Sequence, residues 1–147
     1  MTEPTTESTA TTEPSATTYE PEVETLLERF AAVGREVEEA GWLELPPMIE
    51  ASLATARRGG LTNVCFDLGT CEDLVGTTLS MDDQRARQYG ARYTPLSAAR
   101  RAALARWHTE LKDLRKGLLA LVQRAANAAR AQREEAERAQ RARRRGW

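Results

Sequence analysis

The stretch PLSAARRAALARWHTELKDLRKGLLALVQRAANAARAQREEAERAQRARRR, residues 95–145, decides the fold of this chain. Gly117 is its only glycine, and no proline follows Pro95, so strong helix formers dominate it. Thr94 and Pro95 suit the cap and the first position of a helix. We therefore predict one helix from about Pro95 to Arg145. At 1.5 Å per residue it would be about 75 Å long, so part of it should protrude from a domain of this size.

An apolar stripe runs along the first part of this predicted helix. Its members follow one another at alternating spacings of three and four residues, which is a heptad pattern. They are Leu104, Trp107, Leu111, Leu114, Leu118, Leu121, Ala125 and Ala128. Gln132 and Glu135 stand at the next expected positions, so the apolar stripe ends there. We call these eight residues the seam.

Two interpretations of the seam remain open from the sequence. It packs on an amphipathic helix that begins near Pro21 within one bundle, or it joins a second copy of the chain or a partner helix. In a parallel dimer with Leu104 at position a, Glu110 and Arg115 would be placed to pair between the two helices.

The residues after Ala129 are charged rather than apolar. Oppositely charged side chains stand four apart, as in Arg130 with Glu134, and each such pair contributes about 0.2–0.5 kcal/mol to an exposed helix. No acidic residue follows Glu137, which leaves a positive cluster formed by Arg138, Arg141, Arg143, Arg144 and Arg145. Such a cluster can bind phosphates with strong salt dependence and little sequence discrimination. The alternatives are a solvated helix end or docking onto the acidic half of the chain.

Charge and composition divide the chain into three parts. The net charge is −1, yet Met1 to Glu50 hold 12 acidic and 2 basic residues, whereas Pro95 to Trp147 hold 5 acidic and 14 basic ones. Thr, Glu, Ser, Pro and Ala make up nearly all of the first eighteen residues, which is typical of disorder. We predict a disordered acidic leader over 1–19, a helical bundle over 20–129 and an exposed basic helical tail over 130–147.

Further helices are expected between the leader and the seam. Apolar residues at helical spacing predict an amphipathic helix from Pro21 to about Gly41. Two prolines then allow a second helix from about Pro47 to Arg58, with Ile49, Leu53 and Ala56 facing inward.

Residues 61–79 suggest short helical turns, because a lone strand would have no pairing partner. A separate helix is expected over Met81–Tyr89. The predicted fold class is therefore all-α, a small bundle with a long, protruding C-terminal helix.

The sequence argues against an enzyme and against a resident metal or cofactor. It has no glycine-rich phosphate loop, no GxSxG turn and no HExxH helix. His108 is the only histidine, and Cys65 and Cys71 are the only cysteines, so a metal site would lack ligands. A helix-turn-helix around the paired glycines at 59–60 is disfavoured, because no Lys or Arg stands between Gly59 and Gln84.

Composition also bears on location and origin. The longest unbroken apolar run, Leu118 to Val122, is far shorter than a membrane span, and we expect a cytoplasmic protein without a membrane partner. Arginine outnumbers lysine 19 to 2, as codon usage in a GC-rich genome would produce. We therefore expect a non-enzymatic helical interaction or assembly protein, an accessory protein of a high-GC bacterium, phage or plasmid, that associates through the seam. The alternative is a nucleic-acid-associated accessory factor that uses the basic tail.

Overall fold

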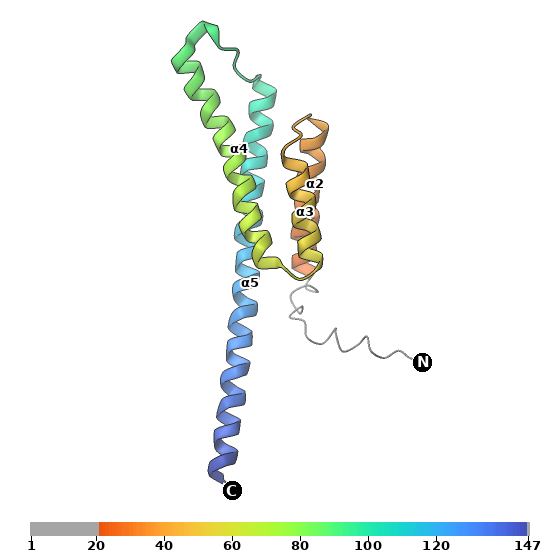
Figure 1. Cartoon of the computed structure of the whole chain (residues 1–147), viewed down its shortest axis with the longest axis vertical. Coiled ribbons are helices and arrows are strands. Elements are labelled where there is room, and N and C mark those ends of the chain that lie inside the picture. The colour runs from red at the N-terminus through yellow and green to blue at the C-terminus, as the bar shows by residue number, and fades with distance from the viewer. Residues whose placement is uncertain (1–20, 147) are drawn as a thin grey trace, which may run out of the picture.

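The computed structural model describes residues 21–146, and these form an all-α bundle with one long protruding helix (Figure 1). The elements are α2 Pro21–Glu39, α3 Leu45–Arg57, α4 Leu61–Tyr89, the short 3-10 helix η2 Gly90–Arg92, and α5 Ala98–Gly146. Helices α4 and α5 form an antiparallel hairpin, with α2 and α3 side by side on its flank, and α5 then runs on past the bundle. The predicted fold class is confirmed. The leader predicted over 1–19 lies outside the described residues.

The core is formed where α2 packs on α3 and α5, and α4 packs on the same two helices. Each helix contributes one apolar face, and most of the buried side chains are aliphatic. Among the most deeply buried are Phe30, Leu45, Ile49, Leu68, Leu104, Leu111, Leu114 and Leu118, and the larger Trp107 is buried as well. None of the helices between residues 21 and 146 is long and apolar enough to cross a bilayer.

Helix α2 ends as its sequence predicts. Gly41 has a φ of +88°, a left-handed conformation that favours glycine. The Trp42 amide donates to the Val37 carbonyl at 3.2 Å, which closes the helix end. Trp42 itself packs against the core.

Helix α3 begins two residues earlier than predicted, at Leu45 rather than Pro47. Both prolines lie in the first turn, where the missing amide hydrogens have no helical partner in any case. Leu45 is fully buried, so tertiary packing holds the helix start there. Ile49 and Ala56 are buried as expected, and Leu53 is partly buried.

The prediction of short turns over 61–79 and a separate helix over Met81–Tyr89 is wrong. A single helix, α4, spans the whole segment. The Thr70 hydroxyl donates back to the Phe66 carbonyl at 3.3 Å within the continuous helix, so this residue does not cap a new one.

Glycines inside α4 also weakened the helical signal in the sequence. Gly69 and Gly76 lie where α4 approaches α5, and a methyl group on them would come within 3.5 Å of Arg115 and 3.1 Å of His108, respectively. Packing against α5 therefore outweighs the unfavourable helix propensity of these glycines.

Helix α5 begins at Ala98 rather than at Pro95. The Ser97 hydroxyl accepts a hydrogen bond from the Arg100 amide at 3.1 Å, so Ser97 is the cap that the sequence assigned to Thr94. The helix then continues without interruption to Gly146, one residue past the predicted end.

Candidate functional site

The structure divides the seam between the core and the solvent. Six of its residues, from Leu104 to Leu121, are buried within the bundle of the chain itself. Ala125 is partly exposed and Ala128 is exposed. The interpretation that the stripe packs within one bundle therefore describes most of the seam, and only its two alanines remain accessible to another chain.

Trp107 fits the seam because α2 offers it a polar partner. Its indole nitrogen donates to Glu36 Oε1 at 2.9 Å, and Arg106 donates to the same oxygen at 3.0 Å. The hydrogen bond from Trp107, followed by that from Arg106, holds the pKa of the Glu36 carboxyl below its ordinary value. A buried ring with a satisfied N–H is stable in a core that is otherwise aliphatic.

The two charged residues that could pair across a parallel dimer are engaged within the chain. Arg29 of α2 binds Glu110 through two parallel hydrogen bonds of 2.9 and 3.0 Å, which lower the pKa of Glu110. Arg115 donates to Glu72 of α4 at 2.9 Å. These contacts fix α5 against both of its neighbours within the chain.

The cysteines and the histidine are arranged for packing rather than for nucleophilic chemistry. Cys65 and Cys71 are buried free thiols, and burial raises the pKa of Cys71 to about 12. His108 lies on the flank of the seam, with Nε2 3.9 Å from the Glu72 carboxylate. No group of three His, Cys, Asp or Glu side chains that could hold a metal ion occurs within residues 21–146.

Past Leu121, α5 becomes an isolated helix that touches little of the bundle. We call residues 122–146 the α5 extension. Every residue from Ala126 to Gly146 is exposed, including all five arginines of the predicted cluster, which are Arg138, Arg141, Arg143, Arg144 and Arg145. Side chains within 125–146 form no ion pair within 4.0 Å with any described residue, so these arginines are available to an external anion.

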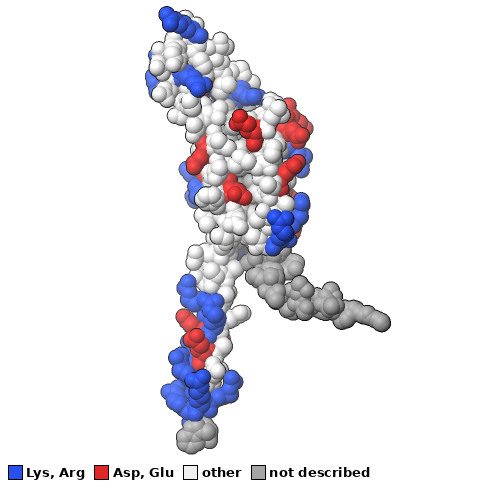
Figure 2. All heavy atoms as spheres, viewed as in Figure 1, with Lys and Arg blue, Asp and Glu red and all other residues white. Residues whose placement is uncertain are grey.

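The α5 extension has two unlike sides. At about 100° per residue, one side carries Arg130, Arg133, Arg138, Arg141, Arg144 and Arg145, with two glutamates among them. The other side continues the direction of the buried seam and carries Ala125, Ala128, Ala129, Ala136 and Ala139, with Gln132 and Arg143 among them. Figure 2 shows Lys and Arg side chains along this extension and at the opposite end of the molecule, with Asp and Glu mostly over the bundle between them.

The opposite end of the molecule is a second basic region, which the sequence reasoning missed. We call residues 81–101, where α4 turns through η2 into α5, the tip. From Gln84 to Arg101 the chain has five arginines and no acidic residue. This basic run lies outside the α5 extension. Arg85, Arg87 and Arg92 are exposed on it, as is Tyr89 with half of its surface accessible.

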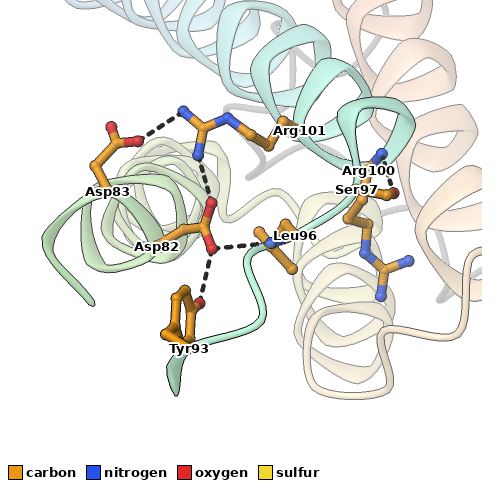
Figure 3. A network of polar contacts seen from close by, with 7 residues as sticks. All are labelled: Asp82, Asp83, Tyr93, Leu96, Ser97, Arg100 and Arg101. Atoms are coloured by element: carbon orange, nitrogen blue, oxygen red, sulfur yellow. Dashed lines mark hydrogen bonds and ion pairs between the residues drawn. The ribbon is translucent and has the colours of Figure 1, made fainter. Parts of the chain in front are cut away.

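A polar network centred on Asp82 holds the tip in shape (Figure 3). The Tyr93 hydroxyl donates to Asp82 Oδ1 at 2.7 Å, and the Leu96 amide donates to the same oxygen at 3.0 Å. Arg101 binds the other carboxylate oxygen at 2.6 Å and Asp83 at 3.1 Å. The bond from Tyr93, then those from Leu96 and Arg101, lower the pKa of Asp82.

Comparison with known proteins returned no family model, no curated protein and no solved structure that matches this chain.

Proposed function

We propose that this protein is a non-enzymatic helical interaction protein and that the exposed arginines of its α5 extension bind the phosphate backbone of nucleic acid. The observation that carries the proposal is the exposure of Arg138, Arg141, Arg143, Arg144 and Arg145 on an isolated helix, without an ion-pair partner among the described residues. Guanidinium groups bind phosphate oxygens through paired hydrogen bonds, and they gain affinity by releasing counterions.

The composition of the α5 extension favours nucleic acid over a lipid surface. A helix that lies on a membrane needs large apolar side chains opposite its basic side. Here the opposite side carries small alanines with Gln132 and Arg143 among them, and Val122 is the last large aliphatic residue of the described helix. Such a helix can contact phosphates electrostatically, but it has little apolar surface to insert among acyl chains.

The test is duplex DNA binding by the full chain and by a chain truncated after Ala129, each at 50 and 200 mM salt. We expect the truncation to lower affinity at least about tenfold at low salt, with a shallower dependence of affinity on salt concentration. A full-length variant with the five clustered arginines changed to glutamine should behave like the truncation, which separates charge from helix length.

A matched control removes charge from the bundle instead. Arg35, Arg57 and Arg58 are exposed arginines of α2 and of the end of α3. Their triple change to alanine should leave affinity within about threefold, because the acidic bundle around them repels phosphate. Equal binding by the full chain and the truncated chain would contradict the proposal.

Self-association is the second candidate function. It is favoured by Val122 and Ala125, which are only partly buried where the seam leaves the bundle, beside an open hollow of about 420 Å³ lined partly by Leu26, Gly117 and Leu121. A second helix laid there would extend the heptad packing. Light scattering across a hundredfold concentration range is the test, and a constant monomer mass would contradict self-association.

A further inference from the structure

We propose that the tip is a second phosphate-contacting site and that the protein bridges two nucleic-acid duplexes, one held at each end; this inference rests on the proposed function of the α5 extension. It assigns a binding role to Arg85, Arg87 and Arg92.

The tip keeps a positive charge because its five arginines outnumber its two carboxylates. Asp82 and Asp83 are the only acidic residues between 81 and 101, and both bind Arg101. Arg100 donates to the Ala40 carbonyl at 2.8 Å and ties the tip to the end of α2. Arg85 lies beside the Tyr93 hydroxyl, which carries no charge, so the charge of Arg85, Arg87 and Arg92 is left for an external anion.

The network around Asp82 also holds the backbone of the tip in a fixed conformation. Asp82 is 4% exposed, and it joins α4, the connecting segment and α5 through Tyr93, Leu96 and Arg101. A preformed site loses less conformational entropy on binding than a flexible loop would. The half-exposed ring of Tyr89 lies among the arginines in sequence, and its hydroxyl can also donate to a phosphate oxygen.

The two basic ends are far apart. Helix α5 joins them without interruption, and its 49 residues correspond to about 73 Å at 1.5 Å per residue. Between them lies an acidic body, because residues 21–80 and 102–121 together carry thirteen acidic and eight basic side chains. A duplex lying along the molecule would be repelled by this body, whereas two duplexes at the two ends avoid it.

The experiment uses the full chain and blunt DNA duplexes of about 12 base pairs, roughly 40 Å long, which are too short to reach both ends of the molecule at once. One duplex is immobilised on beads and a second, fluorescent duplex is offered in solution. We expect the full chain to capture the second duplex on the first. The Arg85→Ala/Arg87→Ala/Arg92→Ala variant should bind a single duplex within about threefold of the wild type, yet capture the second at less than about a tenth of its level.

Two controls test whether a loss of duplex capture comes from the tip arginines themselves, rather than from a change in net charge or in folding. The Arg35→Ala/Arg57→Ala/Arg58→Ala variant has the same net charge as the tip variant and should capture the second duplex like the wild type. Circular dichroism and melting temperature show whether each variant keeps the fold. Vesicles containing phosphatidylserine are tested in parallel, and clustering of vesicles without capture of a duplex would overturn the inference in favour of a membrane surface.

The outcomes separate this inference from the function on which it rests. If the full chain binds the immobilised duplex but captures no second one, or if the tip variant captures it as well as the wild type, bridging through the tip is overturned and the role of the α5 extension stands. Capture lost equally in both triple variants would mark a net-charge effect and overturn it as well. Failure of the full chain to bind the first duplex contradicts the proposed function, and the inference falls with it.

Discussion

The two parts of α5 form one continuous helix for different physical reasons. From Ala98 to Leu121 the helix presents leucines to α2 and α4, and its charged side chains bind those helices. Arg124 still binds Glu22 of α2 at 2.8 Å, but from Ala126 to Gly146 the helix has lost these contacts and every residue is exposed. The first part is helical because packing of its apolar face stabilises it, and the second because alanine, arginine and glutamate have high helix propensity.

This difference shows that continuity of secondary structure says little about continuity of role. The buried part belongs to the bundle, and changes there should act on folding. The α5 extension is attached to that bundle at one end only, and changes there should act on what the molecule binds. Four predictions test this division, in order of decreasing expected effect.

The largest effect is expected in the buried part. Leu111 is fully buried, so Leu111→Ala should lower the free energy of unfolding by about 2–5 kcal/mol through lost burial and a residual cavity. Ala128→Ser, on the same stripe but exposed, should change it by less than about 0.5 kcal/mol. Urea unfolding measures both. Comparable costs for the two changes would show that the division near Leu121 is misplaced.

A smaller effect on stability should depend on pH at the tip. Because the pKa of Asp82 is lower in the folded chain than in the unfolded chain, its ionised form stabilises the fold at neutral pH. This contribution is lost as pH falls below the ordinary aspartate value of about 3.9 towards the folded value. The stability gap between wild type and Asp82→Asn, measured by urea midpoints, should stay constant from about pH 7 to 5 and then narrow below about pH 4.

Asp73→Asn provides the control for that measurement. Asp73 lies on the same helix, is exposed, and has no ion pair among the described residues. Its variant should follow the wild type at every pH. A gap for Asp82→Asn that widened on acidification would have the wrong sign for a carboxylate stabilised in its ionised form.

The acidic leader should weaken phosphate binding by competition for the arginines of the α5 extension. Residues 1–19 contain three glutamates and no basic residue. Their deletion should raise affinity for duplex DNA about two- to fivefold at 50 mM salt, with little difference at 200 mM, because screening weakens such contacts. Fluorescence anisotropy measures both. Lower affinity after deletion would mean that the leader assists binding.

The smallest effect is expected when the α5 extension is shortened. A chain truncated after Ala129 should keep its free energy of unfolding within about 0.5 kcal/mol of the full chain, since the removed residues contact nothing in the core. Urea unfolding at matched salt is the measurement. A loss of more than about 2 kcal/mol would show that the segment packs on the bundle or on another chain.

Much of the fold could be predicted from local patterns in the sequence. The seam, the glycine that ends α2 and the uniform helix propensity of the C-terminal third all act over a few residues, and the all-α architecture follows from them. Helix α4 could not be predicted in this way. Gly69 and Gly76 weaken its helical pattern, and only their close approach to Arg115 and His108 explains why the helix continues.

The candidate sites were predictable to unequal degrees. The arginines of the α5 extension stand out in the sequence because no acidic residue follows Glu137. The tip stands out less, because Asp82 and Asp83 directly precede its five arginines. Only the structure shows that Arg101 already occupies both carboxylates.

The sequence by itself determined that this chain is helical, that its charge is separated between its two halves, and that its apolar seam must be buried against another apolar surface. Those properties depend on composition and on spacing along a single helix. The tertiary structure decided what covers the seam, because burial of Leu104 to Leu121 against α2 and α4 requires segments up to about eighty residues away in the sequence to meet, as Arg29 meets Glu110. It also decided which charges remain free, since an ion pair between distant residues leaves no pattern in the sequence.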